Sequence, residues 1–121
     1  MTRIRIITEP HQDLLESITY DVTEWCINYF NLQKKVKKIT VDISGIALDD
    51  AWGECGEDDK DGHYLIDVSP LQSTRDFVAT LVHEIVHVKQ WATGKWVGEG
   101  EREANQLQYA LTDKVWKEGV F

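Results

Sequence analysis

The stretch from Thr74 to Trp91 most strongly constrains the fold, because a helix formed by it is apolar on nearly every side. A helix of that kind has to be buried by other parts of the chain. His83, Glu84 and His87 lie within this stretch, and burying polar side chains costs free energy unless each has a partner. The sequence therefore predicts a buried central helix that carries a polar site.

The chain of 121 residues is long enough for one compact domain and little more. It contains no internal repeat, low-complexity segment or evident linker, so we predict that residues 1–121 form a single domain. Its formal net charge of -8 would repel the phosphate backbone of a nucleic acid, and the basic run from Lys34 to Lys38 is short. We therefore expect no nucleic-acid partner.

The sequence also indicates where in the cell the protein is located. No stretch approaches the roughly 18 consecutive apolar residues of a membrane-spanning helix. The segment Met1–Ile7 reaches Glu9 and Pro10 too soon for the apolar core of a signal peptide. We expect a soluble, cytoplasmic protein with no membrane partner.

Cys26 and Cys55 show no CxxC spacing and are predicted to be free thiols.

Apolar periodicity and turn residues divide the chain into helices and strands, in the α+β class. Gly94 is the predicted stop of the buried helix, and either Ser69 or Ser73 supplies its N-cap. A small three-stranded sheet is expected. The predicted elements are an amphipathic helix at His11–Leu32, strands at Lys38–Ser44, Ala51–Cys55 and His63–Val68, the buried helix at Thr74–Trp91, and a last helix at Glu101–Lys117.

The buried helix carries the pattern HExxH in residues 83–87. Residues four apart share a face of a helix, so the imidazoles of His83 and His87 can bind one metal ion, for which zinc is expected. Glu84 lies about 100° around the helix from His83 and can take a proton from metal-bound water as a general base. The alternative is that both histidines are core residues bonded to backbone carbonyls, with Glu84 at the surface.

A catalytic zinc site needs a third protein ligand and leaves its last position to water. The metzincin motif HExxHxxGxxH is excluded, because this chain has Gln90 at the position of the motif's glycine and Thr93 at the position of its third histidine. Glu101 and Asn105 share a face of the last helix, which fits a ligand and the side chain that orients a histidine. Glu103 is the alternative third ligand.

The motifs HEIVH and EREAN together resemble those of the gluzincins, metallopeptidases with HExxH on one helix and a glutamate on the next. The small size is similar to that of minigluzincins, and the expected fold is similar to SprT-like and ImmA-type domains. The resemblance covers roughly residues 41–111. It implies a zincin-like fold and one zinc ion per chain, bound by His83, His87 and Glu101. It further implies that Glu84 is the base and that Asn105 orients a ligand.

The same resemblance implies a substrate groove along the edge strand that precedes the HExxH helix. We expect this strand at His63–Val68, with His63, Tyr64, Leu65 and Ile66 contacting the substrate. The alternative is a plain edge strand without a binding role.

A peptidase also needs a donor to the oxyanion, and no spacing chooses among Tyr64, Tyr109, His63 and Arg102. The expected activity is that of a zinc metalloendopeptidase, which hydrolyses a peptide or protein substrate through zinc-bound water activated by Glu84. The alternative is a zincin-fold binding or regulatory module that is catalytically weak or latent and acts through a protein partner.

Overall fold

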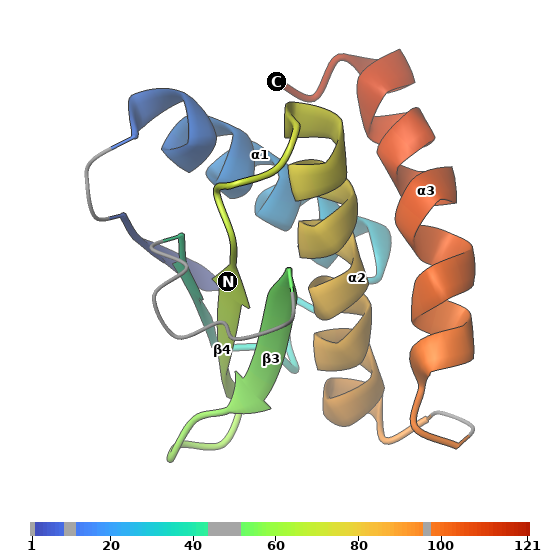
Figure 1. Cartoon of the computed structure of the whole chain (residues 1–121). Coiled ribbons are helices and arrows are strands. Elements are labelled where there is room, and N and C mark those ends of the chain that lie inside the picture. The colour runs from blue at the N-terminus through green and yellow to red at the C-terminus, as the bar shows by residue number, and fades with distance from the viewer. Residues whose placement is uncertain (1, 9–11, 44–51, 96–97) are drawn as a thin grey trace.

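A computed structural model describes residues 2–8, 12–43, 52–95 and 98–121 of the chain (Figure 1). These residues form three helices and a four-stranded mixed sheet, so the predicted α+β class is confirmed. In chain order the elements are β1 (Arg3–Ile7), α1 (Asp13–Tyr29), β2 (Lys38–Asp42), β3 (Gly53–Glu57), β4 (His63–Val68), α2 (Thr74–Thr93) and α3 (Glu101–Glu118).

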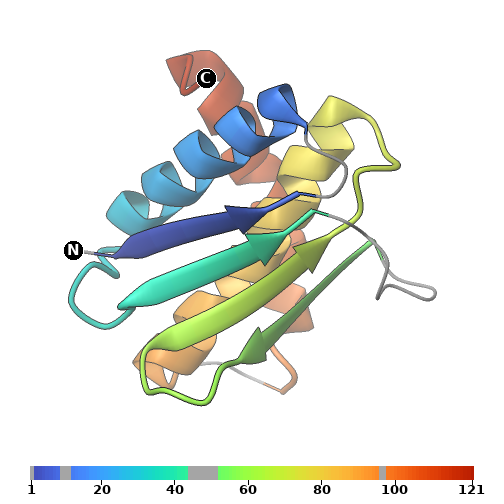
Figure 2. The same cartoon turned by 90° about the vertical axis from the view of Figure 1, so that its left-hand side faces the viewer.

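The sheet has the strand order β1-β2-β4-β3. The strands β1, β2 and β4 are parallel, whereas β3 pairs antiparallel with β4 and forms one edge. Alternation along β2 and β4 places Ile39, Val41, Tyr64 and Ile66 on one face, where all four are buried. Figure 2 shows that the helices lie behind this single face of the sheet.

The helix α2 lies between the sheet and α3, and α1 covers the sheet beside it (Figure 1). Because α2 has neighbours on opposite sides, its apolar residues around the whole helix are buried, including Phe77, Leu81 and Ile85. The prediction of a buried central helix is confirmed. None of the helices in the described part of the chain is long and apolar enough to cross a membrane.

The two ends of α2 are set by residues with clear local chemistry. The Ser73 hydroxyl accepts a hydrogen bond from the Asp76 backbone N–H at 3.2 Å, which resolves the choice between the two predicted N-caps. Gly94 ends the helix with a left-handed φ of 67°, as predicted. His83 and His87 therefore lie in the middle of the helix, away from either fraying end.

The prediction of a three-stranded sheet is wrong, because Arg3–Ile7 forms a fourth strand. This strand pairs parallel with β2, with Ile4 opposite Ile39 and Ile6 opposite Val41. A parallel pair needs a crossover connection, which α1 provides. The strand therefore depends on a partner more than thirty residues away, and its five residues carry little local signal.

The prediction that His63–Val68 forms the edge of the sheet is also wrong. It forms β4, an interior strand that pairs with β2 on one side and with β3 on the other. The chain folds back through the turn after β3, so the strand next to α2 in sequence is not the outermost strand. The edge beside α2 is β3.

Element boundaries differ from the predictions by a few residues. The first helix ends at Tyr29 rather than Leu32, because Asn31 adopts a left-handed φ of 55°. The strand expected at Ala51–Cys55 is Gly53–Glu57. The predicted boundary residues His11, Ser44 and Ala51 lie outside the described residues.

Both cysteines are free thiols, as predicted. Cys26 lies in the core on α1, where burial raises the pKa of its thiol to about 12. Cys55 is half-buried on β3, and its pKa is raised by burial first and then by the neighbouring Glu84 carboxylate. Both side chains therefore stay protonated at neutral pH.

The close contact between β3 and α2 requires a glycine at position 53. A Cβ atom added at Gly53 would lie 2.6 Å from Thr80 Cγ2, whereas one at Gly56 on the same strand would meet nothing within 4 Å. We predict that Gly53→Ala lowers the free energy of unfolding by about 1–3 kcal/mol through overpacking. The matched control Gly56→Ala should change it by less than about 0.5 kcal/mol. Urea unfolding measures both, and equal effects would contradict the close approach.

Candidate metal centre

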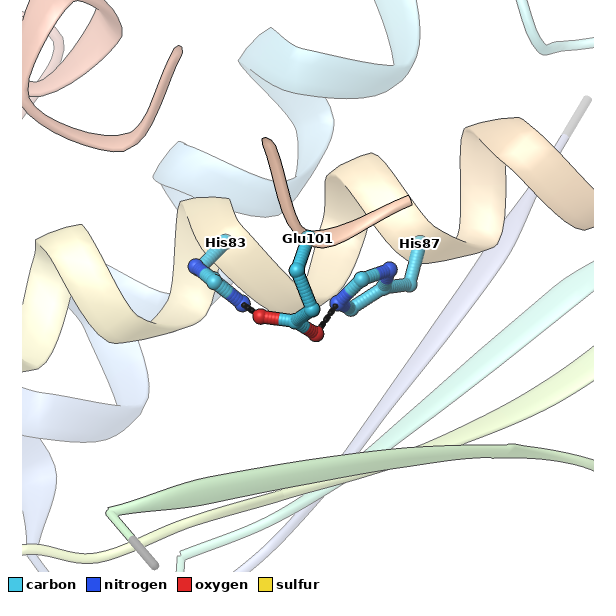
Figure 3. Close-up of side chains that lie close together, drawn as sticks. All are labelled: His83, His87 and Glu101. Atoms are coloured by element: carbon cyan, nitrogen blue, oxygen red, sulfur yellow. Dashed lines mark hydrogen bonds and ion pairs between the residues drawn. The ribbon is translucent and has the colours of Figure 1, made fainter. Parts of the chain in front are cut away.

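Three predicted ligands meet where α2 passes the start of α3. His83 and His87 lie one turn apart on α2, and Glu101 is the first residue of α3. Figure 3 shows the Glu101 carboxylate between the two imidazoles. The Nε2 atom of His87 lies 2.7 Å from Oε1 of Glu101, and that of His83 lies 3.2 Å from Oε2. One ligand atom from each residue lies within 4.8 Å of the other two.

The ring orientation of His87 is fixed by the buried side chain of Gln90. The Gln90 amide nitrogen donates to the Gly100 carbonyl oxygen at 2.9 Å and to a Glu103 carboxylate oxygen at 3.0 Å. Because both amide hydrogens have acceptors, the amide oxygen must face His87 Nδ1, which lies 2.9 Å away. His87 Nδ1 therefore carries the proton and donates, and Nε2 keeps its lone pair.

A glutamine of α3 orients the His83 imidazole in the same way. Its Nδ1 atom lies 2.6 Å from the amide oxygen of Gln108. A proton on Nδ1 again leaves the lone pair on Nε2, which points at Glu101. In their neutral forms the two imidazoles and the carboxylate thus present only lone pairs to one another. A cation among them could therefore be bound by all three groups.

The donor set fits a zinc ion. Two neutral imidazole nitrogens and one carboxylate are the three protein ligands of a known class of catalytic zinc sites. Ligand atoms around a tetrahedral zinc ion are about 3.3 Å apart. The nitrogen–oxygen distances of 2.7 and 3.2 Å are close to that spacing, so a small withdrawal of the half-exposed Glu101 side chain would make room for the ion. These three residues can therefore hold a divalent metal ion.

Glu84 lies beside this group and is 7% exposed. No hydrogen bond holds its carboxylate among the residues that the structure describes. Burial raises the pKa of this carboxyl, and the two neighbouring imidazoles act in the opposite direction. A Cβ atom at Gly53 would lie 3.2 Å from a Glu84 carboxylate oxygen, so the glycine keeps space open beside the carboxylate.

Two hollows of similar size flank Glu84 and His83, which line both. The first, of about 530 Å³, is called the Tyr109 hollow, and the second, of about 520 Å³, the Glu99 hollow. Water and an extended ligand can therefore reach Glu84 from either side. Besides Glu84 and His83, the Tyr109 hollow is lined by Trp52, Leu71, Asp76, Thr80 and Tyr109, among others, and the Glu99 hollow by Glu54, Cys55, Trp91 and Glu99, among others.

The alternative third ligand, Glu103, is bound elsewhere. Its carboxylate accepts hydrogen bonds from Lys89 Nζ at 2.7 Å and from Gln90 at 3.0 Å. Those two bonds hold the pKa of the Glu103 carboxyl below its usual range. Glu103 thereby fastens the first turn of α3 to α2, and Glu101 is the carboxylate that faces the histidines.

Asn105, predicted to orient a ligating histidine, is exposed on α3. Within the described part of the chain, no hydrogen bond joins Asn105 to either imidazole. Gln90 and Gln108 occupy the two Nδ1 positions instead. The sequence carried a signal for both, because Gln90 follows His87 by three residues and Gln108 follows Glu101 by seven, which places each pair on one helix face.

Gly100 is a further residue that the sequence reasoning missed. It has a left-handed φ of 80°, and a Cβ atom there would collide with the Gln90 amide. Only a glycine allows the chain to enter α3 while its carbonyl accepts the hydrogen bond from Gln90. The position of Glu101, the next residue, depends on this close approach.

The residues predicted to contact a substrate do not lie at this site. Tyr64 and Ile66 are buried beneath the helices, and Leu65 is 41% exposed on the opposite face of the sheet, the face to which His63 also points by strand alternation. None of the four lines either hollow. The edge strand β3 takes their place, because Gly53 lines both hollows.

Comparisons with known proteins give no family for this chain. No protein-family model, no curated protein and no solved structure matches it. The resemblance of HEIVH and EREAN to the gluzincin motifs therefore stays a prediction. The interpretation of the site rests on the positions of its own side chains.

We predict that Glu101→Ala abolishes stoichiometric zinc binding, because it removes the carboxylate that lies between the two Nε2 atoms. The control Glu103→Gln should retain about one zinc ion per chain, since its side chain is not a ligand. Elemental mass spectrometry of protein purified without chelator measures the metal content. Loss of zinc in Glu103→Gln alone would reverse the assignment of the third ligand.

A second prediction concerns the histidine tautomers. Gln108→Ala should weaken zinc binding about 10- to 100-fold, because His83 loses the acceptor that keeps its proton on Nδ1. Asn105→Ala removes an amide from the same helix and should leave the affinity unchanged. Competition with a chromophoric chelator gives both affinities. An equal loss in the Asn105 variant would restore Asn105 as the orienting residue.

Proposed function

We propose that this protein is a zinc metalloendopeptidase. The proposal is carried by one observation: the Nε2 atoms of His83 and His87 converge on the Glu101 carboxylate beside the buried carboxylate of Glu84. A metal ion with three protein ligands and an adjacent carboxylate is the arrangement used for metal-assisted hydrolysis.

Each residue of the group has a separate role in this reaction. His83, His87 and Glu101 would hold the metal ion. When bound, zinc acts as a Lewis acid and lowers the pKa of coordinated water to about 7. Glu84 accepts the proton of the attacking water and returns it to the leaving amine. Its carboxylate suits this role because no hydrogen bond engages it among the described residues and both hollows reach it.

Tyr109 is the best supported donor to the oxyanion. Of the four candidates taken from the sequence, Tyr109 alone lines a hollow together with His83 and Glu84. Tyr64 is buried and stacks on Trp91, with ring centroids 6.2 Å apart. We propose that the Tyr109 hydroxyl donates a hydrogen bond to the oxygen on which negative charge develops.

The free edge of β3 is the proposed binding place for the substrate backbone. Within the described residues, β3 pairs with β4 on one side and with no strand on the other. Gly53, Glu54 and Cys55 all line the Glu99 hollow, although their side chains alternate between the faces of the sheet. The strand therefore turns its backbone edge to the hollow, which favours addition of an extended peptide as a further strand.

We predict that Glu84→Gln retains zinc but lowers kcat/KM for peptide hydrolysis about 10²- to 10⁴-fold, because the amide cannot accept the proton. His87→Ala should lose both zinc and activity. Cleavage of casein and of a mixed peptide library, with metal content measured on the same samples, tests this.

Turnover by Glu84→Gln equal to that of the parent would refute the role of Glu84. A zinc-loaded parent that binds acetohydroxamate but cleaves no peptide would favour the binding-module alternative, because its metal position is open without being catalytic.

A further inference from the structure

The Glu99 hollow is strongly acidic. Glu54 from β3 and Glu99 from the segment before α3 line it, together with Glu84 and Glu101 of the metal centre. The two charges of a zinc ion would balance two of these four carboxylates and leave two. Among the described residues, no lysine or arginine lines either hollow.

Two basic side chains of α2 have partners outside the Glu99 hollow. Lys89 on α2 binds the Glu103 carboxylate at 2.7 Å and lies over the ring of Phe30. Arg75 pairs with Asp113, and its guanidinium lies over the ring of Trp116 on α3. Neither one lines the Glu99 hollow, so neither is in place to neutralise its carboxylates.

The hollow also has an aromatic wall and a buried charge. Trp91 lines it, and stacking against Tyr64 at an interplanar angle of 9° holds the indole in place. The aliphatic stem of a lysine or arginine packs well on such a ring, and its charged head is attracted to the ring face. Glu84, more than nine-tenths buried and without a hydrogen-bond partner among the described residues, faces the same space.

The Tyr109 hollow on the other side of Glu84 has a different character. Its rim carries three exposed apolar or aromatic side chains, Trp52, Leu71 and Tyr109, and among the described residues Asp76 is its one carboxylate besides Glu84. The volumes of the two hollows are nearly equal, at about 530 and 520 Å³. Charge rather than size therefore distinguishes the two sides of the site.

The direction of β3 relates each hollow to one side of the cleaved bond. From Trp52 to Cys55 the chain passes from the Tyr109 hollow to the Glu99 hollow. A peptide added antiparallel to β3, which is the more stable pairing, runs in the opposite sense. Residues before the cleaved bond then lie in the Glu99 hollow, and residues after it lie in the Tyr109 hollow.

We propose that the Glu99 hollow selects a lysine or arginine side chain just before the cleaved bond, so that the substrates are basic peptide segments. This inference rests on the metallopeptidase function proposed above. Glu54 and Glu99 are the specificity-determining residues, and both are exposed, so their substitution spares the core.

The test uses zinc-loaded full-length protein and three probes that differ in one side chain: the hydroxamates of acetyl-alanyl-lysine, acetyl-alanyl-leucine and acetyl-alanyl-glutamate. Each hydroxamate binds zinc and places its last side chain before the position of the cleaved bond. At low salt we expect the lysine probe to bind about tenfold more tightly than the glutamate probe, with leucine between them. Isothermal titration calorimetry gives the dissociation constants.

Matched variants test whether the preference for the lysine probe arises from the Glu99 hollow. In the double variant Glu54→Gln/Glu99→Gln the ratio of lysine to glutamate affinity should fall to within about twofold, since paired surface charges supply it. Asp76→Asn, which removes a carboxylate from the other hollow, should preserve the ratio. Equal binding of the two probes to the parent protein, or a ratio that survives the double variant, would overturn the proposal.

Acetohydroxamate, which has no side chain, separates this proposal from the one on which it rests. Its binding to parent and variants with the same affinity shows an open metal position regardless of side-chain preference. Failure of zinc-loaded protein to bind acetohydroxamate would overturn the metallopeptidase function, and the inferred selectivity with it. Normal acetohydroxamate binding without a lysine preference would overturn the selectivity alone.

Discussion

The hydrogen bonds of one buried amide, that of Gln90, hold the two halves of the site together. Its oxygen sets the protonation of His87, and its nitrogen binds the Gly100 carbonyl and the Glu103 carboxylate. The bond to the Gly100 carbonyl holds the start of α3 against α2, and the bond to Glu103 fastens the first turn of α3. This arrangement places Glu101 beside the two histidines. The position of the proposed ligand Glu101 thus depends on a side chain that does not contact it.

The elements that local patterns predicted well are those whose environment is decided nearby. The apolar residues of α2 were sufficient to predict that it is buried, and Ser73 and Gly94 indicated its ends. The strand Arg3–Ile7 and the edge position of β3 were missed for the opposite reason. Both depend on which strands pair across the sheet, and the order β1-β2-β4-β3 follows from long-range contacts that a one-dimensional pattern does not contain.

The same distinction between local and long-range information applies to the residues of the site. The spacing within 83–87 and the acidic start of the last helix were enough to nominate His83, His87 and Glu101, which the structure brings together. Which amide orients which imidazole depends on how α3 is rotated against α2. That rotation turns Gln108 toward His83 and leaves Asn105 in solvent, a difference of three residues that helix periodicity alone does not resolve.

The location of Glu101 at the first residue of α3 has a consequence for folding. Since α3 packs mainly on α2, an ion shared by the two helices would act as a cross-link between them. Binding to the folded state alone adds stability through thermodynamic linkage, which amounts to about 2.7 kcal/mol when free zinc exceeds its dissociation constant a hundredfold. Removal of the metal would then weaken the packing of α3 on α2. Metal binding and the docking of that helix would then be thermodynamically coupled.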